Sequence, residues 1–387
     1  MNFRLSDRLS QLPPYLFAEV DAMKAEKIKQ GIEIIDFGVG DPDLPTPKKV
    51  VESMKRAVEK DQNQKYPSYE GMLSFREAVA NFYGRRRKVK LNPEREIIAL
   101  IGSKEGIAHL PLAFVNPGDY VLIPDPGYPV YYGSTIFACG KPYTIPLEKE
   151  NGFLPDLHAI PEDVVTKSKL MFLNYPNNPT ASVAEMEFIK EAVEFCIDNE
   201  IILAQDAAYS EVSFDYRVKS FLEFDDAFEV TVEFNSLSKT YNMTGWRIGF
   251  ALGNPDILSG LLKIKTNVDS GVFQAVQEAS ITAFNECDED IERNNRIYRE
   301  RRDVLIKGLK EIGLKAETPK ATFYVWCEVP EGYDSMSFTK KLLNDAGILV
   351  TPGIGFGKYG EGFVRFALTR SVEIVEKAVE RIKKAGF

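Results

Sequence analysis

Short apolar runs alternate along the chain with longer segments in which apolar residues recur at helical spacing. Six of the runs are rich in β-branched or aromatic residues, which is typical of strands buried on both faces. They lie at 97–101, 120–123, 170–173, 201–205, 230–234 and 248–252. Strands that alternate with helices predict an α/β fold, with a mostly parallel sheet in the larger part of the chain.

The flanking segments predict a second, smaller α/β domain. Helical patterns lie at 16–31, 47–60 and 71–85, ahead of the six apolar runs. A long polar helical stretch at 273–312 predicts a connection between two lobes, and beyond it strands at 322–329 and 363–367 alternate with helices at 337–346 and 372–384. We therefore expect a large domain at 46–280 and a small domain that combines 1–45 with 290–387.

The charge balance narrows the classes of partner. The 387 residues include 48 Lys and Arg against 57 Asp and Glu, for a net charge of −9. Because proteins that neutralise nucleic-acid phosphates are usually basic, we expect no nucleic-acid partner. No apolar run reaches the roughly 18 residues of a membrane span, and the first residues lack the apolar segment of a secretory signal. These patterns predict a cytoplasmic protein without a membrane partner.

Cysteine and histidine are too sparse to predict a metal site. The four cysteines lie far apart and form no CxxC pair. His109 and His158 are the only histidines, and either is typical of an ordinary surface or core position. We expect neither a zinc site nor a disulfide framework.

The segment 235–249 carries the clearest chemical pattern. Lys239 follows a predicted strand, Ser236 and Ser238 flank it, and Arg247 comes eight positions later. A loop lysine alone is usually a solvated charge. Here two hydroxyls, an arginine and an amine converge at the end of a buried strand. Hydroxyls and a guanidinium suit a phosphate, and a partly neutral amine can attack a carbonyl.

Three further polar positions follow predicted strands. Asp206 directly follows the run at 201–205 and could be a metal ligand, a helix cap or a counter-ion. Asn178 lies in Asn-Tyr-Pro-Asn-Asn-Pro-Thr, which on its own indicates only a turn. The strand-to-helix turn at Ser103 and Lys104 could bind a phosphate, as many such turns can.

Taken together, these motifs resemble the pyridoxal phosphate (PLP) enzymes of the aspartate aminotransferase fold, fold type I, and among them the class I/II aminotransferases. The resemblance spans about 13–369. It implies that Lys239 holds PLP as a Schiff base and later moves a proton, as the catalytic residue of a ping-pong transamination. It also implies that Asp206 keeps the pyridine nitrogen protonated, while Tyr209 and Asn178 bind the 3′-oxygen.

The same resemblance assigns the remaining contacts. Tyr128 would stack on the cofactor ring, and Arg365 would bind the substrate α-carboxylate with Gly40 nearby. Tyr66 and Ser270 would reach the phosphate of a neighbouring subunit, which implies a homodimer. The phosphate of the same subunit would be bound by Ser103, the Lys104 backbone, Ser236, Ser238 and Arg247. One residue departs from the family pattern, since Ala181 follows Asn-Pro-Thr where glycine is usual.

Within the family, the stretches 12–19, 38–47, 102–109, 125–131 and 320–326 are similar to the LL-diaminopimelate aminotransferase group. This resemblance implies transfer of an amino group between LL-diaminopimelate and 2-oxoglutarate in lysine biosynthesis. It adds Tyr15 and Lys104 to Gly40, Tyr128, Asn178 and Arg365 as residues near the substrate.

Three alternatives share this motif set. One is an aminotransferase with broad activity on aspartate, alanine or aromatic amino acids, and another is a PLP-dependent carbon–sulfur lyase. The third is the PLP-binding module of a transcription regulator. Such regulators carry a DNA-binding domain ahead of this fold. The resemblance begins by Pro13 and the chain is acidic, so we do not expect a regulator.

Overall fold

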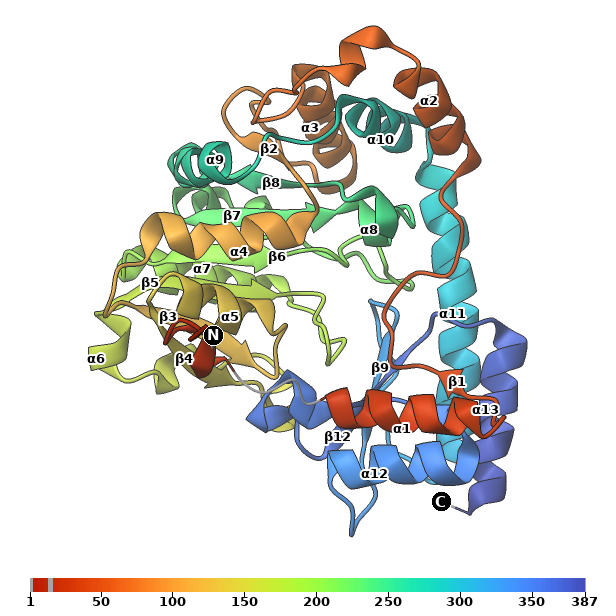
Figure 1. Ribbon diagram of the computed structural model, residues 1–387. Helices are drawn as coiled ribbons and strands as arrows, with labels where there is room; N and C mark the ends of the chain where they lie inside the picture. The colour runs from red at the N-terminus through yellow and green to blue at the C-terminus, as the bar shows by residue number, and fades with distance from the viewer. Residues whose placement is uncertain (1–2, 13–16, 387) are drawn as a thin grey trace.

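The computed structural model describes residues 3–12 and 17–386 and shows two lobes (Figure 1). The upper lobe in that view contains a seven-stranded sheet of order β2-β8-β7-β6-β5-β3-β4. Its strands are β2 (Ile97–Leu100), β3 (Tyr120–Asp125), β4 (Lys141–Pro146), β5 (Ser168–Asn174), β6 (Ile202–Asp206), β7 (Thr231–Ser236) and β8 (Gly249–Gly253). Only the pairings of β8 with β2 and β7 are antiparallel among these described strands. The predicted α/β class with a mostly parallel sheet is confirmed.

Helices cover both faces of this sheet (Figure 1). Because successive side chains of a strand point to opposite faces, Ile98 and Leu100 of β2 enter one core, whereas Ile97 and Ala99 enter the other. The first core is closed by α4 (Ser103–Phe114), α5 (Val130–Phe137) and α9 (Pro255–Val268). The second is closed by α2 (Lys48–Val58), α3 (Leu73–Arg87), α7 (Met186–Asp198), α10 (Gln274–Glu286) and the short α6 (Glu162–Val165).

Strand β4 was not predicted. It lies at the edge of the sheet, and all of its residues except the buried Ile145 are exposed or partly exposed. Two prolines lie within it, which an edge strand tolerates because one of its sides needs no hydrogen-bond donors. Strand β4 therefore lacks the continuous apolar run that identifies the predicted strands of the sheet.

The stretch 273–312, predicted as one polar helix, is two helices. Helix α10 ends at Glu286, and α11 (Asp288–Glu311) begins after the fully buried Cys287. The inward face of α10, with Ala279 and Phe284, belongs to the core of the large sheet. Helix α11 runs from the upper lobe to the lower one, as predicted for a connection (Figure 1).

The lower lobe is built around a three-stranded antiparallel sheet of order β11-β12-β9. Its strands are β9 (Tyr324–Glu328), β11 (Thr351–Pro352) and β12 (Phe363–Ala367). Its helices are α1 (Phe17–Lys29), α12 (Ser335–Lys341) and α13 (Val372–Ala385), and a π-turn at Leu342–Ala346 continues α12. Strand β1 (Ile35–Asp36) pairs in parallel with β10 (Ile348–Leu349), so the N-terminal segment lies beside the C-terminal part of the chain.

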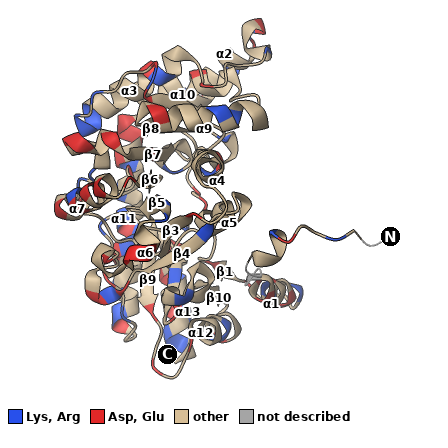
Figure 2. Ribbon diagram, turned by 90° about the vertical axis from the view of Figure 1, so that its left-hand side faces the viewer, with Lys and Arg blue, Asp and Glu red and all other residues tan. Residues whose placement is uncertain are grey.

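The surface charges do not gather by sign on the face shown in Figure 2, where blue and red residues are interspersed over both lobes. In residues 3–12 and 17–386, no helix is both long enough and apolar enough to cross a membrane.

Candidate active site

Most of the predicted site residues line one pocket of about 300 Å³ at the carboxyl ends of the central strands. Asn174, Asp206 and Ser236 are the last residues of β5, β6 and β7, where ligands bind in open α/β sheets. The predicted residues that line the pocket are Gly40, Ser103, Lys104, Tyr128, Asn178, Asp206, Tyr209, Ser236, Ser238, Lys239, Arg247 and Arg365.

Lys239 lies in the one-turn helix α8 (Leu237–Thr240), directly after β7. Its Nζ donates a hydrogen bond to the carbonyl of Gly40 at 3.2 Å. Burial, together with the charges of Arg365 and Arg247, lowers the pKa of the amine to about 8, although the carboxylates of Asp41 and Asp206 oppose this shift. The amine is therefore partly neutral near pH 7, as attack on a carbonyl carbon requires.

Asp206 is a buried carboxylate held by three neighbours. One oxygen accepts from the Tyr131 hydroxyl at 2.8 Å and the other from the Ala208 N–H at 3.3 Å. The Asn174 amide donates to the Asp206 backbone carbonyl at 2.7 Å. Burial raises the pKa of the carboxyl to about 6, although the hydrogen bonds from Tyr131 and Ala208 and the charge of Lys239 oppose this shift. A cationic group placed beside Asp206 would offset the cost of burying this charge.

Arg365, in β12, is fixed from several sides. Its Nη1 donates to the Asn178 side-chain oxygen at 2.6 Å, and its Nη2 donates to the Gly38 carbonyl at 2.9 Å. The guanidinium carbon lies 4.2 Å from the centre of the Tyr324 ring and 4.7 Å from that of Phe356. Its Nε has no hydrogen-bond partner among the described residues. The result is a rigid, buried cation that suits a carboxylate ligand.

A cluster of donors surrounds the N-terminus of α4. Gly102 has a φ of +74°, and a Cβ at this position would lie 2.5 Å from Nη2 of Arg247. Glycine therefore permits both the turn and the close approach of the guanidinium. The hydroxyls of Ser103, Ser236 and Ser238 line the same pocket. Hydroxyls, a guanidinium and a helix N-terminus together favour a phosphate.

The sequence did not identify several contributors. Tyr324 lines the pocket, and its hydroxyl lies 2.9 Å from the hydroxyl of Tyr209. A Cβ on Gly40 would lie 2.1 Å from the Tyr324 hydroxyl, so this glycine provides space for the tyrosine. The other missed lining residues are Asn174, Ala208 and Thr244. The missed Tyr131 lies behind Asp206, and its spacing of three residues from Tyr128 was a signal that could have been used.

Two of the described predicted residues do not line this pocket. Tyr66 is 88% exposed, and Ser270 is also exposed. Tyr15 lies outside the described residues. Ala181, at the position where glycine is usual in the family, has a φ of +62°, so the turn keeps the left-handed conformation that favours glycine.

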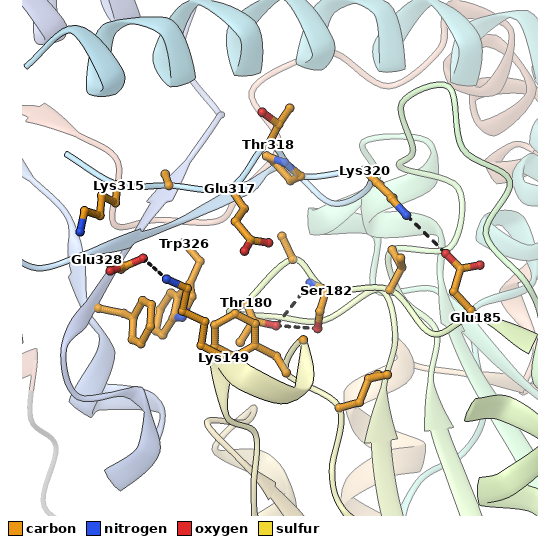
Figure 3. A pocket seen from close by; sticks show the side chains of 18 residues that line it. Lys149, Thr180, Ser182, Glu185, Lys315, Glu317, Thr318, Lys320, Trp326 and Glu328 are labelled. Carbon is orange, nitrogen blue, oxygen red and sulfur yellow. Dashed lines mark hydrogen bonds and ion pairs between the residues drawn. The ribbon is translucent and has the colours of Figure 1, made fainter. Parts of the chain in front are cut away.

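A second cavity of about 310 Å³ lies between the lobes and is shown in Figure 3. Four of its charged groups form ion pairs, since Lys149 pairs with Glu328 at 2.6 Å and Lys320 with Glu185 at 3.4 Å. Among the described residues that line it, none is a predicted site residue. The chemistry therefore centres on the pocket around Lys239.

Comparison with known proteins agrees with this geometry. The family model of class I and II aminotransferases matches residues 32–382. The chain belongs to this family. It is 55% identical to the LL-diaminopimelate aminotransferase of Aquifex aeolicus, across 98% of this chain and 99% of the relative.

Solved structures of related proteins have the same fold. An apo-BacF structure from Bacillus subtilis is 40% identical, with a TM-score of 0.95 over 100% of this chain and 99% of that one. A double mutant of the aspartate aminotransferase of Thermus thermophilus is 29% identical, with a TM-score of 0.92 over 99% of this chain and 100% of that one. The predictions of an aspartate aminotransferase fold and of a transaminase are confirmed.

Proposed function

We propose that this aminotransferase transfers an amino group between LL-diaminopimelate and 2-oxoglutarate, in lysine biosynthesis, with PLP as its cofactor. The observation that carries the proposal is the meeting of the Lys239 amine, the Asp206 carboxylate and the Arg365 guanidinium in one pocket. The choice of substrate rests on the Aquifex aeolicus relative, which is similar over nearly the whole length of both chains.

The residues of the pocket fit PLP. An aldehyde needs a buried amine with a lowered pKa, which Lys239 provides. A pyridinium nitrogen needs a buried carboxylate, which Asp206 provides. A phosphate needs the donors around the N-terminus of α4. Tyr128 lines the same pocket and is the candidate to stack on the pyridine ring. When bound, PLP supplies an electron sink that stabilises negative charge at the substrate Cα.

The roles of the side chains follow from their contacts. Arg365 binds the substrate α-carboxylate and thereby fixes the position of Cα. Lys239 would be the base that takes the proton from the substrate Cα and delivers it to the C4′ carbon of the cofactor. Tyr209, whose hydroxyl lies 2.9 Å from that of Tyr324, would donate a hydrogen bond to the cofactor 3′-oxygen. Asn178 uses its side-chain oxygen for Arg365, which leaves its amide nitrogen to bind the same cofactor oxygen.

We also propose a homodimer with shared sites. Tyr66 and Ser270 are exposed and lie away from the pocket of their own subunit, as expected if they serve the pocket of a partner. The division into a large domain at 46–280 and a small domain from 1–45 with 290–387 is part of this proposal. It is supported by the separate cores of the two sheets.

The cofactor assignment predicts a pH-dependent uptake of PLP by the cofactor-free protein. Because only the neutral amine attacks an aldehyde, and the pKa of Lys239 is about 8, the rate should rise about tenfold per pH unit below 8. It should level off above about pH 9. Stopped-flow absorbance gives the rate, and a Lys263→Ala protein, which lacks an exposed lysine, serves as the control. A rate that does not change between pH 6 and 9, or a midpoint near 10.5, would contradict the assignment.

A further inference from the structure

An ion cluster around the buried Lys265 lies outside the residues that line the pocket. The side chain of Lys265, in α9, is fully buried, and its Nζ lies 2.9 and 3.0 Å from the carboxylate oxygens of Asp269. The same Nζ lies 3.2 and 3.4 Å from the oxygens of Glu105, whose Oε1 is also 3.3 Å from Nδ1 of His109. The two carboxylates and the histidine have the spacing of metal ligands, but the ammonium of Lys265 already bridges the carboxylates.

One end of this cluster is attached to the phosphate-binding turn. Glu105 lies in the first turn of α4, and its Oε2 accepts a hydrogen bond from the Ile101 N–H at 2.7 Å. Ile101 directly follows β2, and Ser103 begins α4. The position of the cluster is therefore set by the segment that presents Ser103 and Lys104 to the pocket.

The other end holds the turn that carries Ser270. Asp269 accepts a hydrogen bond from the Gly271 N–H at 2.7 Å, which closes the turn. Gly271 has a φ of +85°, and a Cβ there would lie 2.8 Å from the carbonyl oxygen of Ser68. The turn at 269–271 thus packs directly against the loop that carries Tyr66. The turn that carries Ser270 therefore supports the loop that carries Tyr66, and the ion cluster around Lys265 holds that turn.

A buried lysine between two carboxylates is an expensive way to fill this space. Lys265 loses its hydration and the two carboxylates lose most of theirs, whereas an apolar side chain of similar length would pack there without that cost. The ions fix the two elements relative to each other, because Lys265 binds a carboxylate of α4 and a carboxylate of the 269–271 turn at the same time. An apolar residue would not do this.

We propose that Lys265 is a positioning residue, which holds the 269–271 turn and the adjoining Tyr66 loop so that they bind the cofactor phosphate of the partner subunit. This inference rests on the proposed homodimer with shared sites. The anchoring bond from Ile101 to Glu105 does not involve Lys265. Loss of the lysine should therefore disturb the partner's site more than the site of its own subunit.

Hybrid dimers with a single working site test this inference. A chain with Lys239→Ala cannot link to the cofactor, so each hybrid has near-visible absorbance from one site only. In the first hybrid, a Lys265→Met chain supplies the working site and a Lys239→Ala chain is its partner. In the second, a wild-type chain supplies the working site and its partner carries both Lys239→Ala and Lys265→Met. The control pairs a wild-type chain with a Lys239→Ala chain, and PLP titration gives the affinity of each working site.

We expect the second hybrid to bind PLP about tenfold more weakly than the control, as for the loss of one hydrogen bond to a charged group. The first hybrid should stay within about twofold of the control. Equal PLP affinities in the two hybrids and the control would overturn the inference. A loss of affinity in the first hybrid alone, or an equal loss in both hybrids, would also overturn it. If Lys265→Met does not fold, Asp269→Asn in the same two arrangements must give the same pattern. A control that forms no dimer or binds no PLP would contradict the proposed function instead.

Discussion

Replacement of Lys239 by alanine is expected to lower kcat for amino transfer by at least about 10⁴-fold. The physical reason is that the amine is the only group of the described pocket with both the nucleophilicity and the pKa for the reaction. It is buried, its pKa is about 8, and it lies after β7 at the centre of the pocket. We expect no replacement by Lys104, the other lysine that lines the described pocket, because it lies in the first turn of α4, among the donors that favour a phosphate.

The measurement is steady-state turnover combined with the absorbance of bound cofactor. The alanine variant should lose both the activity and the near-visible absorbance of lysine-linked PLP. The matched control is Lys263→Ala, which removes an exposed lysine of α9 and should leave both unchanged. A Lys239→Ala protein that still turns over at a wild-type rate would contradict the assigned chemistry.

The second large effect is expected at Arg365. Arg365→Lys keeps the charge but loses the planar fork that contacts Asn178 and Gly38 and stacks between Tyr324 and Phe356. Since a hydrogen bond between charged groups contributes about 1.5–3 kcal/mol, kcat/KM should fall about 10²-fold. The change should appear mainly as a higher KM, because the α-carboxylate is bound before and during the reaction.

Kinetics with both the amino acid and the 2-oxo acid check this prediction. Each substrate carries a carboxylate next to the reacting carbon, so both KM values should rise together. Arg299→Lys is the control, because Arg299 is an exposed arginine of α11 paired with Asp215. Unchanged KM values in Arg365→Lys would show that another residue binds the carboxylate.

The sequence predicted the central sheet well because its interior strands are buried on both faces. The run at 201–205, for example, corresponds to β6 within one residue at either end. It did not predict β4, β1, β10 or β11. Strand β4 has a mixed pattern of exposed and partly buried residues, and two-residue strands such as β1 exist only through their pairing with a distant segment. The break at Cys287 was missed because neither glycine nor proline marks it.

The site was predictable where a polar residue ends an apolar strand, as Asp206 does. Tyr324 and Tyr131 were missed because an aromatic residue in an apolar segment has the pattern of an ordinary core residue. Lys265 was missed for the opposite reason, since a lysine in a helical pattern is expected on the surface, whereas this one is fully buried. The burial of Lys265 results from the packing of α9 against α4 and the 269–271 turn, which the sequence pattern does not show.

The most direct test of the central claim is a single half-reaction. Protein loaded with PLP is mixed separately with LL-diaminopimelate, glutamate, aspartate and tyrosine, and the shift of cofactor absorbance to the amine form is followed. The proposed function predicts rapid shifts with LL-diaminopimelate and with glutamate, the amino form of 2-oxoglutarate, and much slower shifts with aspartate and tyrosine. A rapid shift with aspartate or tyrosine but not with LL-diaminopimelate would contradict the substrate. Release of pyruvate and ammonia without any shift would contradict amino transfer itself and favour a lyase.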